Sequence, residues 1–384
     1  MSRLVFLCPD APGGVRSYVS NLSLFLTKKS IDHAVILYGY CNRLVTRKSI
    51  GDLPHSTRIL FSKYGTAGSA NKDLAALIGK EDILICNDAP ELEAVSYNGL
   101  KNRIIFVLHG DLRHYDAILK RYETLIDEVF CVSEGLKAKY SRIYTGIPFT
   151  VCYPMVRNYS PEINYNEKAP LKGVFIGRFE HLKGADTFLK VVLKAADTGL
   201  SIEWRVFATS KGSDMQLLAG LPPSVGTFFD LPNDKLLESI EGADFLLFPS
   251  RSEGFGMAVL ECMKRAIVPI ARNIPIGIPD MVKDGESGYL VEDVDDSLLI
   301  IKKLDRDRAG LHRMKEKTTA FAAAHFDYER SGERFITCIG EAQQKALRPD
   351  KAFPFHKPRF VERIAPESLY RILKYVHNTI KRRK

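Results

Sequence analysis

Short apolar runs alternate with helical patterns along this chain, and the alternation occurs in two separate series. In the first series the segments with the length and composition of buried strands are 3–8, 34–38, 58–61, 83–86, 103–108 and 128–132. Stretches with helical spacing, such as 15–26 and 115–126, lie between several of them. Strands apolar on both faces that alternate with helices are typical of a parallel sheet covered on two sides.

A second series of candidate strands follows a break in the pattern. The break is the polar segment 153–170, which holds Pro154, Pro161 and Pro170 and is predicted to be a linker. The later strands are expected at 173–176, 203–208, 227–229, 244–248, 267–271 and 288–291. A helical pattern at 328–347 is expected to close the second domain.

The sequence therefore predicts an α/β protein of two doubly wound, Rossmann-like domains. Ligands bind such sheets beyond the carboxyl ends of the strands, so a central crevice between the domains is expected. The predicted division is 1–153 for the first domain, 154–170 for the linker, 171–347 for the second domain and 348–384 for a basic tail. A length of 384 residues suits two domains.

Composition excludes several classes of protein. Hydrophobic content of 45% and charged content of 26% are ordinary for a soluble globular protein, and no apolar stretch approaches the roughly 18 residues that cross a bilayer. The apolar run 4–8 is too short for a signal peptide, so a cytoplasmic location is expected. Seven cysteines without a Cys-x-x-Cys pair argue against a disulfide framework or a zinc site.

The positive charge is concentrated at the carboxyl terminus. Residues 345–384 hold twelve Lys or Arg against three acids, which accounts for the formal net charge of +9. From Pro366 the spacing predicts an amphipathic helix, with apolar side chains at Leu369, Ile372, Leu373, Val376 and Ile380. Two interpretations stay open: the segment 366–384 lies on an anionic membrane surface, or it docks on the first domain. No motif of a nucleic-acid-reading module accompanies the charge.

Two glutamates eight positions apart form the most informative local pattern. Glu253 lies in a turn after the candidate strand 244–248, and Glu261 lies two turns into a helix. Between them, Gly254, Phe255 and Gly256 form a permissive turn whose helix-start N–H groups could hold an anion. Carboxylates accept hydrogen bonds from hydroxyls, so the pattern suits a ligand with many hydroxyls and a phosphate.

A second cluster follows the first strand of the second series. The strand ends at Gly177, and a helix is expected to begin near Gly184. Arg178 and Lys183 therefore project from one short loop. Two cations at a helix start favour a diphosphate site, because each adds a charge-assisted hydrogen bond.

These two patterns together resemble the signature of retaining GT-B glycosyltransferases, family 4, the "group 1" transferases. The resemblance implies that Glu261 holds the ribose hydroxyls of a nucleotide sugar and that Glu253 contacts the transferred sugar. It implies that Arg178 and Lys183 hold the donor diphosphate. It covers residues 1 to about 347, strongly in the second domain and diffusely in the first.

The first domain supplies weaker candidates. The turn at Gly13 and Gly14 is glycine-rich without being a dinucleotide-binding or Walker motif, and the resemblance implies that it approaches the donor. His109 closes a strand and, by the same resemblance, reaches the transferred sugar; His114 is the less favoured alternative. Arg16 could add charge to the turn, and Ser133 is expected to be a helix N-cap.

The expected activity is metal-independent transfer of a sugar from a nucleotide-diphosphate sugar to a glycan or lipid-linked acceptor, with no cofactor. The resemblance associates this activity with bacterial surface polysaccharide or lipopolysaccharide biosynthesis, the commonest role of relatives of this size. The Asp-x-Asp at 293–295 opens a predicted helix and is expected to be a cap, not a metal site. The alternatives are a sugar phosphorylase or epimerase on the same fold, and a non-catalytic nucleotide-sugar-binding protein.

Overall fold

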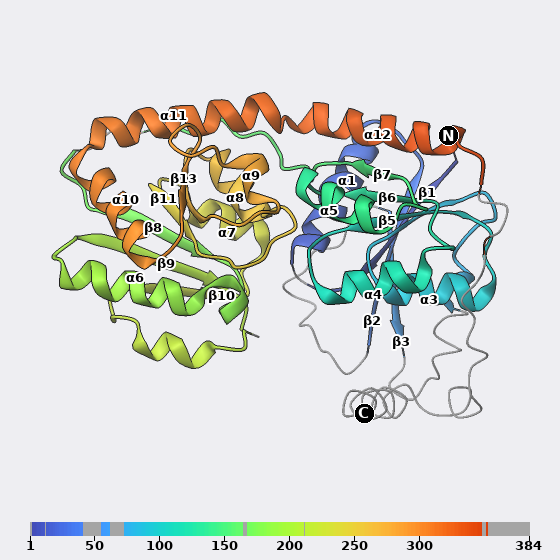
Figure 1. Cartoon of the computed structure of the whole chain (residues 1–384), viewed down its shortest axis with the longest axis horizontal. Coiled ribbons are helices and arrows are strands. Elements are labelled where there is room, and N and C mark those ends of the chain that lie inside the picture. The colour runs from blue at the N-terminus through green and yellow to red at the C-terminus, as the bar shows by residue number, and fades with distance from the viewer. Residues whose placement is uncertain are drawn as a thin grey trace.

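The structure is a computed structural model that describes residues 2–11, 13–40, 55–61, 73–163, 167–210, 212–347 and 351. Two parallel sheets, one in each half of the chain, form its frame (Figure 1). The first sheet has the strand order β3-β2-β1-β4-β5-β6-β7. Its strands are β1 Leu4–Pro9, β2 His33–Tyr40, β3 Ser56–Phe61, β4 Ile83–Cys86, β5 Arg103–Leu108, β6 Glu128–Cys131 and β7 Phe149–Val151. Its helices are α1 Gly14–Lys28, α3 Ala89–Asn98, α4 Arg113–Tyr122 and α5 Glu134–Ile143.

The second sheet has the strand order β10-β9-β8-β11-β12-β13, again with every pair parallel. Its strands are β8 Leu171–Ile176, β9 Ile202–Ala208, β10 Gly226–Phe229, β11 Phe245–Phe248, β12 Val268–Arg272 and β13 Tyr289–Val291. Its helices are α6 Ala185–Asp197, α7 Asn233–Ser239, α8 Met257–Met263, α9 Ile278–Met281, α10 Val294–Arg306 and α11 Arg308–His325, with 3₁₀ turns at His181–Lys183 and Met215–Gly220.

The predicted fold of two doubly wound domains is confirmed. Each expected strand is present within one or two residues of its predicted bounds. The central strands β4 and β11 are buried along their whole length, because helices cover both faces of each sheet. The short strand β7 was not predicted, since three residues carry too little periodicity to be distinguished from a loop.

The helix expected to close the second domain packs on the first domain instead. This helix, α12 Tyr328–Gln344, runs along the first sheet (Figure 1). The ring of Phe335 stacks on Phe6 of β1 at 6.1 Å and meets Phe130 of β6 edge-on at 6.0 Å. Gly332 lies directly beneath Phe25 of α1, where an added Cβ would come within 2.3 Å of the ring. The expectation was wrong because an amphipathic pattern shows that one face is buried but does not say against what.

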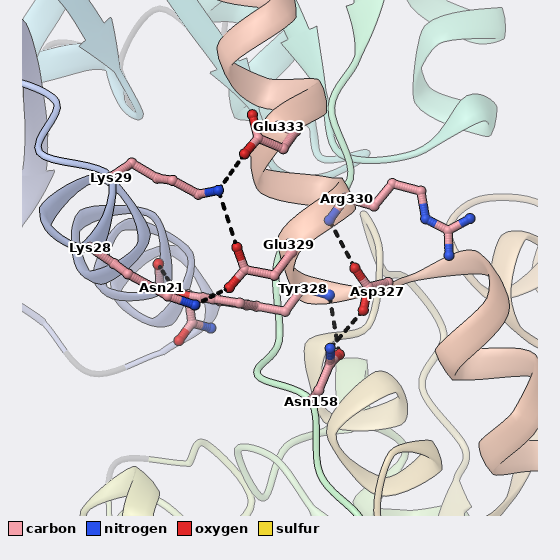
Figure 2. Close-up of polar contacts among 9 residues, drawn as sticks. All are labelled: Asn21, Lys28, Lys29, Asn158, Asp327, Tyr328, Glu329, Arg330 and Glu333. Carbon is pink, nitrogen blue, oxygen red and sulfur yellow. Dashed lines mark hydrogen bonds and ion pairs between the residues drawn. The ribbon is translucent and has the colours of Figure 1, made fainter.

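Surface ion pairs also join α12 to α1. Figure 2 shows Lys28 and Lys29, at the end of α1, beside Glu329 and Glu333 of α12. Lys29 lies 2.5 Å from Glu333 and 3.4 Å from Glu329. Exposed pairs of this kind add less than about 1 kcal/mol each, so the aromatic contacts carry most of the attachment.

The chain crosses between the domains twice, and a polar cluster ties the two crossings together. Asn158 donates to Asp327 at 2.6 Å and accepts from the backbone N–H of Tyr328 at 3.1 Å (Figure 2). Its side-chain oxygen also accepts from the Lys264 ammonium at 2.8 Å. Burial lowers the pKa of Lys264 to about 8. The linker and the start of α12 are thus fixed to each other and to the end of α8.

No helix in the described part of the chain is both long enough and apolar enough to cross a bilayer. The predicted amphipathic segment 366–384 lies outside the described residues.

Candidate active site

A cleft of about 760 Å³ lies between the carboxyl ends of the two sheets and is lined by residues of both domains. Every residue that the sequence predicted for the site lines this one cleft: Gly13, Gly14, His109, Gly177, Arg178, Lys183, Glu253, Gly254, Phe255, Gly256 and Glu261. Their individual roles remain predictions. His114, the less favoured alternative to His109, is exposed and is not among the lining residues.

The two domains touch inside the cleft at Gly254. A Cβ at this position would come within 1.9 Å of the His109 carbonyl oxygen and 2.9 Å of the Gly110 Cα. Only glycine allows so close an approach between the turn after β11 and the end of β5. The contact therefore places the Glu253 turn of the second domain directly against His109 of the first.

The glutamates occupy different environments. Glu253 lies 2.6 Å from the Lys183 ammonium, an ion pair in which both side chains are largely buried. Glu261 is 6% exposed and receives one weak hydrogen bond, at 3.4 Å, from the amide of Asn233. Burial raises the pKa of Glu261 to about 7, against the smaller opposing effects of the Asn233 hydrogen bond and the Arg265 charge. Its carboxylate oxygens therefore remain largely available to hydroxyl donors.

The cation loop is fixed against the Glu253 turn. Gly184 ends the loop with a φ of +74°, and a Cβ there would lie 2.2 Å from the Pro249 carbonyl oxygen. Arg251 donates to both carboxylate oxygens of Asp186, at 2.7 and 2.8 Å. These contacts explain how Lys183 reaches Glu253 although the two are far apart in sequence.

Arg178 differs from Lys183 in its exposure. Its side chain is 54% exposed and lies 3.0 Å from Glu180, at the rim of the cleft. An exposed guanidinium can turn toward an anion at little desolvation cost. Arg178 is therefore less rigidly placed than Lys183.

His109 is held by partners from the first domain. Its Nε2 lies 2.7 Å from the side-chain oxygen of Asn87, and its ring meets Tyr18 edge-on at 5.1 Å. Burial lowers the pKa of His109 to about 3, so the imidazole is neutral at physiological pH. The partner Asn87 was not predicted, because nothing in the sequence links the ends of β4 and β5.

The glycine turn opens α1 on the other side of the cleft. Gly13 has a φ of +140°, and Gly14 lies opposite Met257 at the start of α8, 3.9 Å from an added Cβ to the Met257 side chain. The N-cap of α1 is Gly13, so among the described residues no N-cap side chain binds the first N–H groups of this helix. Arg16, expected to add charge here, is buried and pairs with Asp10 at 3.0 Å.

Sequence reasoning also missed an aromatic pair and a polar partner in the second domain. Phe207 of β9 and Phe228 of β10 stack at 5.0 Å, with ring planes 12° apart, and both line the cleft. Asn233, which contacts Glu261, begins α7. These residues could have been found because β9 and β10 end at the same edge of the sheet as β8, which Gly177 follows.

The predicted caps are confirmed. Ser133 accepts from the backbone N–H of Leu136 at 3.4 Å, and Asp293 accepts from Asp295 and Asp296 at 2.8 and 3.0 Å. Among the described residues, no group of three or more His, Cys, Asp or Glu side chains is arranged to hold a metal ion.

Comparison with known proteins identifies the second domain most clearly. Residues 158–321 match the family model described as "Glycosyl transferases group 1". Granule-bound starch synthase 1 of Pisum sativum is 31% identical over 176 residues, which is 42% of this chain and 28% of that protein. The chain thus spans less than a third of the length of this relative.

Solved structures extend the similarity to both domains. The pneumococcal O-GlcNAc transferase GtfA, in complex with UDP and GlcNAc, has a TM-score of 0.72 and 10% identity, covering 89% of this chain and 99% of that one. HepE of Anabaena, in complex with UDP-glucose, has a TM-score of 0.69 and 14% identity, covering 89% and 100%. The chain has the GT-B fold.

Proposed function

We propose that this protein is a retaining glycosyltransferase that uses a nucleotide-diphosphate sugar. One observation carries the proposal: the Gly254 contact brings the Lys183–Glu253 pair of the second domain against His109 of the first, in a cleft that also holds Glu261. The match of residues 158–321 to a glycosyltransferase family supports it.

In the proposed complex the donor lies along the second domain. Glu261 accepts hydrogen bonds from the ribose hydroxyls, and the Phe207–Phe228 pair offers an apolar surface to the base. Lys183, Arg178 and backbone N–H groups receive the diphosphate. Glu253 contacts the transferred sugar while it orients Lys183 at 2.6 Å.

The proposed transfer breaks the bond between the anomeric carbon and the diphosphate oxygen. The acceptor hydroxyl forms its new bond on the face that the diphosphate leaves, so the anomeric configuration is retained. The proton of that hydroxyl passes to an oxygen of the leaving diphosphate. Lys183 and Arg178 stabilise the charge that develops there, which is the work a metal ion does in other transferases.

The acceptor is proposed to be a glycan or a lipid-linked glycan of bacterial surface polysaccharide or lipopolysaccharide biosynthesis. The basic segment 366–384 supports a location at the inner face of the cytoplasmic membrane, since basic residues add around 1 kcal/mol each near anionic lipid. Co-sedimentation with anionic vesicles at physiological salt tests this location. Equal binding by the chain ending at residue 365 would contradict it.

The test of the function begins with a thermal-shift screen against nucleotide sugars, with UDP-glucose and UDP-GlcNAc first because similar structures contain UDP. Turnover of the stabilising donor is then followed by NMR, which reports the anomeric configuration. A chelator should leave the rate unchanged. Turnover that needs inorganic phosphate in place of a nucleotide would identify a phosphorylase. Donor binding without turnover of any acceptor or water would identify a binding protein.

A further inference from the structure

The buried amide of Asn87 has only one orientation that satisfies its neighbours. Asn87 is 1% exposed, and its side-chain nitrogen donates to the carbonyls of Leu7 at 2.7 Å and Ile85 at 3.3 Å. Both partners are acceptors only, so the NH₂ group must face them. The amide oxygen then faces Nε2 of His109, at 2.7 Å.

This orientation decides which ring nitrogen of His109 carries the proton. An amide oxygen can only accept, so Nε2 must carry the hydrogen and donate it. In the neutral ring the proton on Nε2 leaves Nδ1 unprotonated. His109 can therefore offer a ligand a lone pair at Nδ1 and no proton.

The loop that carries Asn87 is held rigidly by a second buried group. Glu91 of α3 is fully buried, and its carboxyl accepts from the backbone N–H groups of Asn87 and Asp88 and from the Tyr38 hydroxyl. Asp88 caps α3 in the same turn by accepting from the Ala89 N–H at 2.7 Å. The amide is thus placed by the backbone of β4 and α3 and does not depend on a ligand.

We propose that Asn87 is a positioning residue for the proposed transfer: it holds His109 in the neutral Nε2–H form, so that Nδ1 accepts a hydrogen bond from a hydroxyl of the transferred sugar. The inference rests on the proposed function for the identity of the ligand. The proton on Nε2 follows from the contacts of Asn87, and the neutrality of the ring follows from its desolvation. A neutral acceptor at this place avoids a fixed positive charge beside an oxocarbenium-like transition state.

The first experiment measures the ring directly in the wild-type protein. A ¹H–¹⁵N correlation spectrum of the histidine rings, with His109 assigned by comparison with His109→Gln, should show a protonated Nε2 and an unprotonated Nδ1 from pH 6 to 8. A protonated Nδ1, or a ring doubly protonated at pH 7, would overturn the proposal whatever reaction the protein catalyses.

The second experiment changes the partner to a carboxylate. Asn87→Asp keeps the size of the side chain but favours the imidazolium, because an adjacent negative charge raises the pKa of a histidine. We expect kcat to fall by about 10–100-fold at pH 6.5 and to recover partly toward pH 8.5 as the ring loses its proton. The wild-type protein should show no such recovery.

The matched control is Asn98→Asp, the same substitution at the end of α3, where the amide donates to the Ala94 carbonyl at 2.8 Å. It should leave both the ring spectrum and the pH profile unchanged. An Asn87→Asp protein with wild-type kcat and pH profile would overturn the positioning role. If the wild-type protein binds and turns over no nucleotide sugar, the proposed function fails, while the ring spectrum still decides the tautomer.

Discussion

The two sides of the cleft differ in the charged groups that they offer to a ligand. The second-domain side carries charge: Lys183 paired with Glu253, Arg178 at the rim, and the buried Glu261, which accepts a weak hydrogen bond from Asn233. The first-domain side presents a neutral imidazole at His109, and the described charged side chains that line it are already paired, Arg16 with Asp10 and Asp111 with Lys139. In the proposed complex the charged donor therefore lies against the second domain, while the first domain offers a neutral acceptor to a sugar hydroxyl.

The largest effect is expected from Lys183, the cation that lines the cleft and pairs with Glu253 at 2.6 Å. Lys183→Ala should lower kcat/KM by on the order of 10²–10³, the scale for loss of one transition-state charge partner. Steady-state kinetics measure this loss of kcat/KM, and circular dichroism checks that the variant is folded. The control is Lys194→Ala, which breaks a surface ion pair with Asp295 at 2.8 Å. It should change neither kcat/KM nor the circular dichroism spectrum. Near-wild-type turnover in Lys183→Ala would remove this residue from the mechanism.

Forcing the two sides apart should have the next largest effect. In Gly254→Ala the new methyl group would meet the His109 carbonyl at 1.9 Å, so the domains must separate locally. We expect kcat to fall by about 100-fold, because misplacement of reacting groups by about 1 Å has effects of this size. Gly340→Ala in α12, where nothing lies within 4 Å of the added Cβ, is the control. Equal activity of the two variants would show that the contact is not needed for catalysis.

Glu261 should make donor binding depend on pH. With the pKa of Glu261 at about 7, the carboxylate proposed to accept hydrogen bonds from the ribose hydroxyls is lost as pH falls. Affinity should be full above about pH 8 and weaken by up to about tenfold per unit well below pH 7. Glu261→Gln should weaken binding at pH 8 by about 1.5–3 kcal/mol and abolish the pH dependence. Titration calorimetry from pH 6 to 8.5 measures both effects.

Glu261→Gln is expected to weaken donor binding at pH 8 but to stabilise the folded protein at that pH. The folded protein holds the Glu261 proton more tightly than the unfolded chain, so wild-type stability falls as pH rises from about 4.5 through 7. Glu261→Gln removes that loss and should raise Tm at pH 8 more than at pH 5. A variant with no relative gain at pH 8 would show that the buried carboxyl is not strained at neutral pH.

The smallest effect is expected from the exposed cation. Arg178→Ala should lower kcat/KM by less than about tenfold, because a half-exposed charge contributes little compared with a buried one. A loss as large as that of Lys183→Ala would show that Arg178 closes onto the diphosphate when the donor binds. Parallel kinetics on the two variants distinguish these outcomes.

The charged side of the cleft was predictable because its residues lie in short, continuous motifs. Lys183 lies in the loop after β8, Glu253 in the loop after β11 and Glu261 in the next helix, α8, and parallel strands end at one edge of the sheet. The neutral side was harder to predict, because the partners of His109 come from β4 and α1, which are distant in sequence. Asn87 has the same local sequence signal as any asparagine after a strand.

The sequence by itself determined the two sheets and the charged residues that line the cleft, because strand and helix periods and glycine turns are local properties. Only the tertiary structure decided that α12 packs on the first domain, since its apolar face could have covered either sheet. Only the tertiary structure decided the pKa shifts of His109 and Glu261 and the ring nitrogen that donates to Asn87. Desolvation and hydrogen bonding depend on what surrounds a side chain in space, and sequence neighbours do not reveal it.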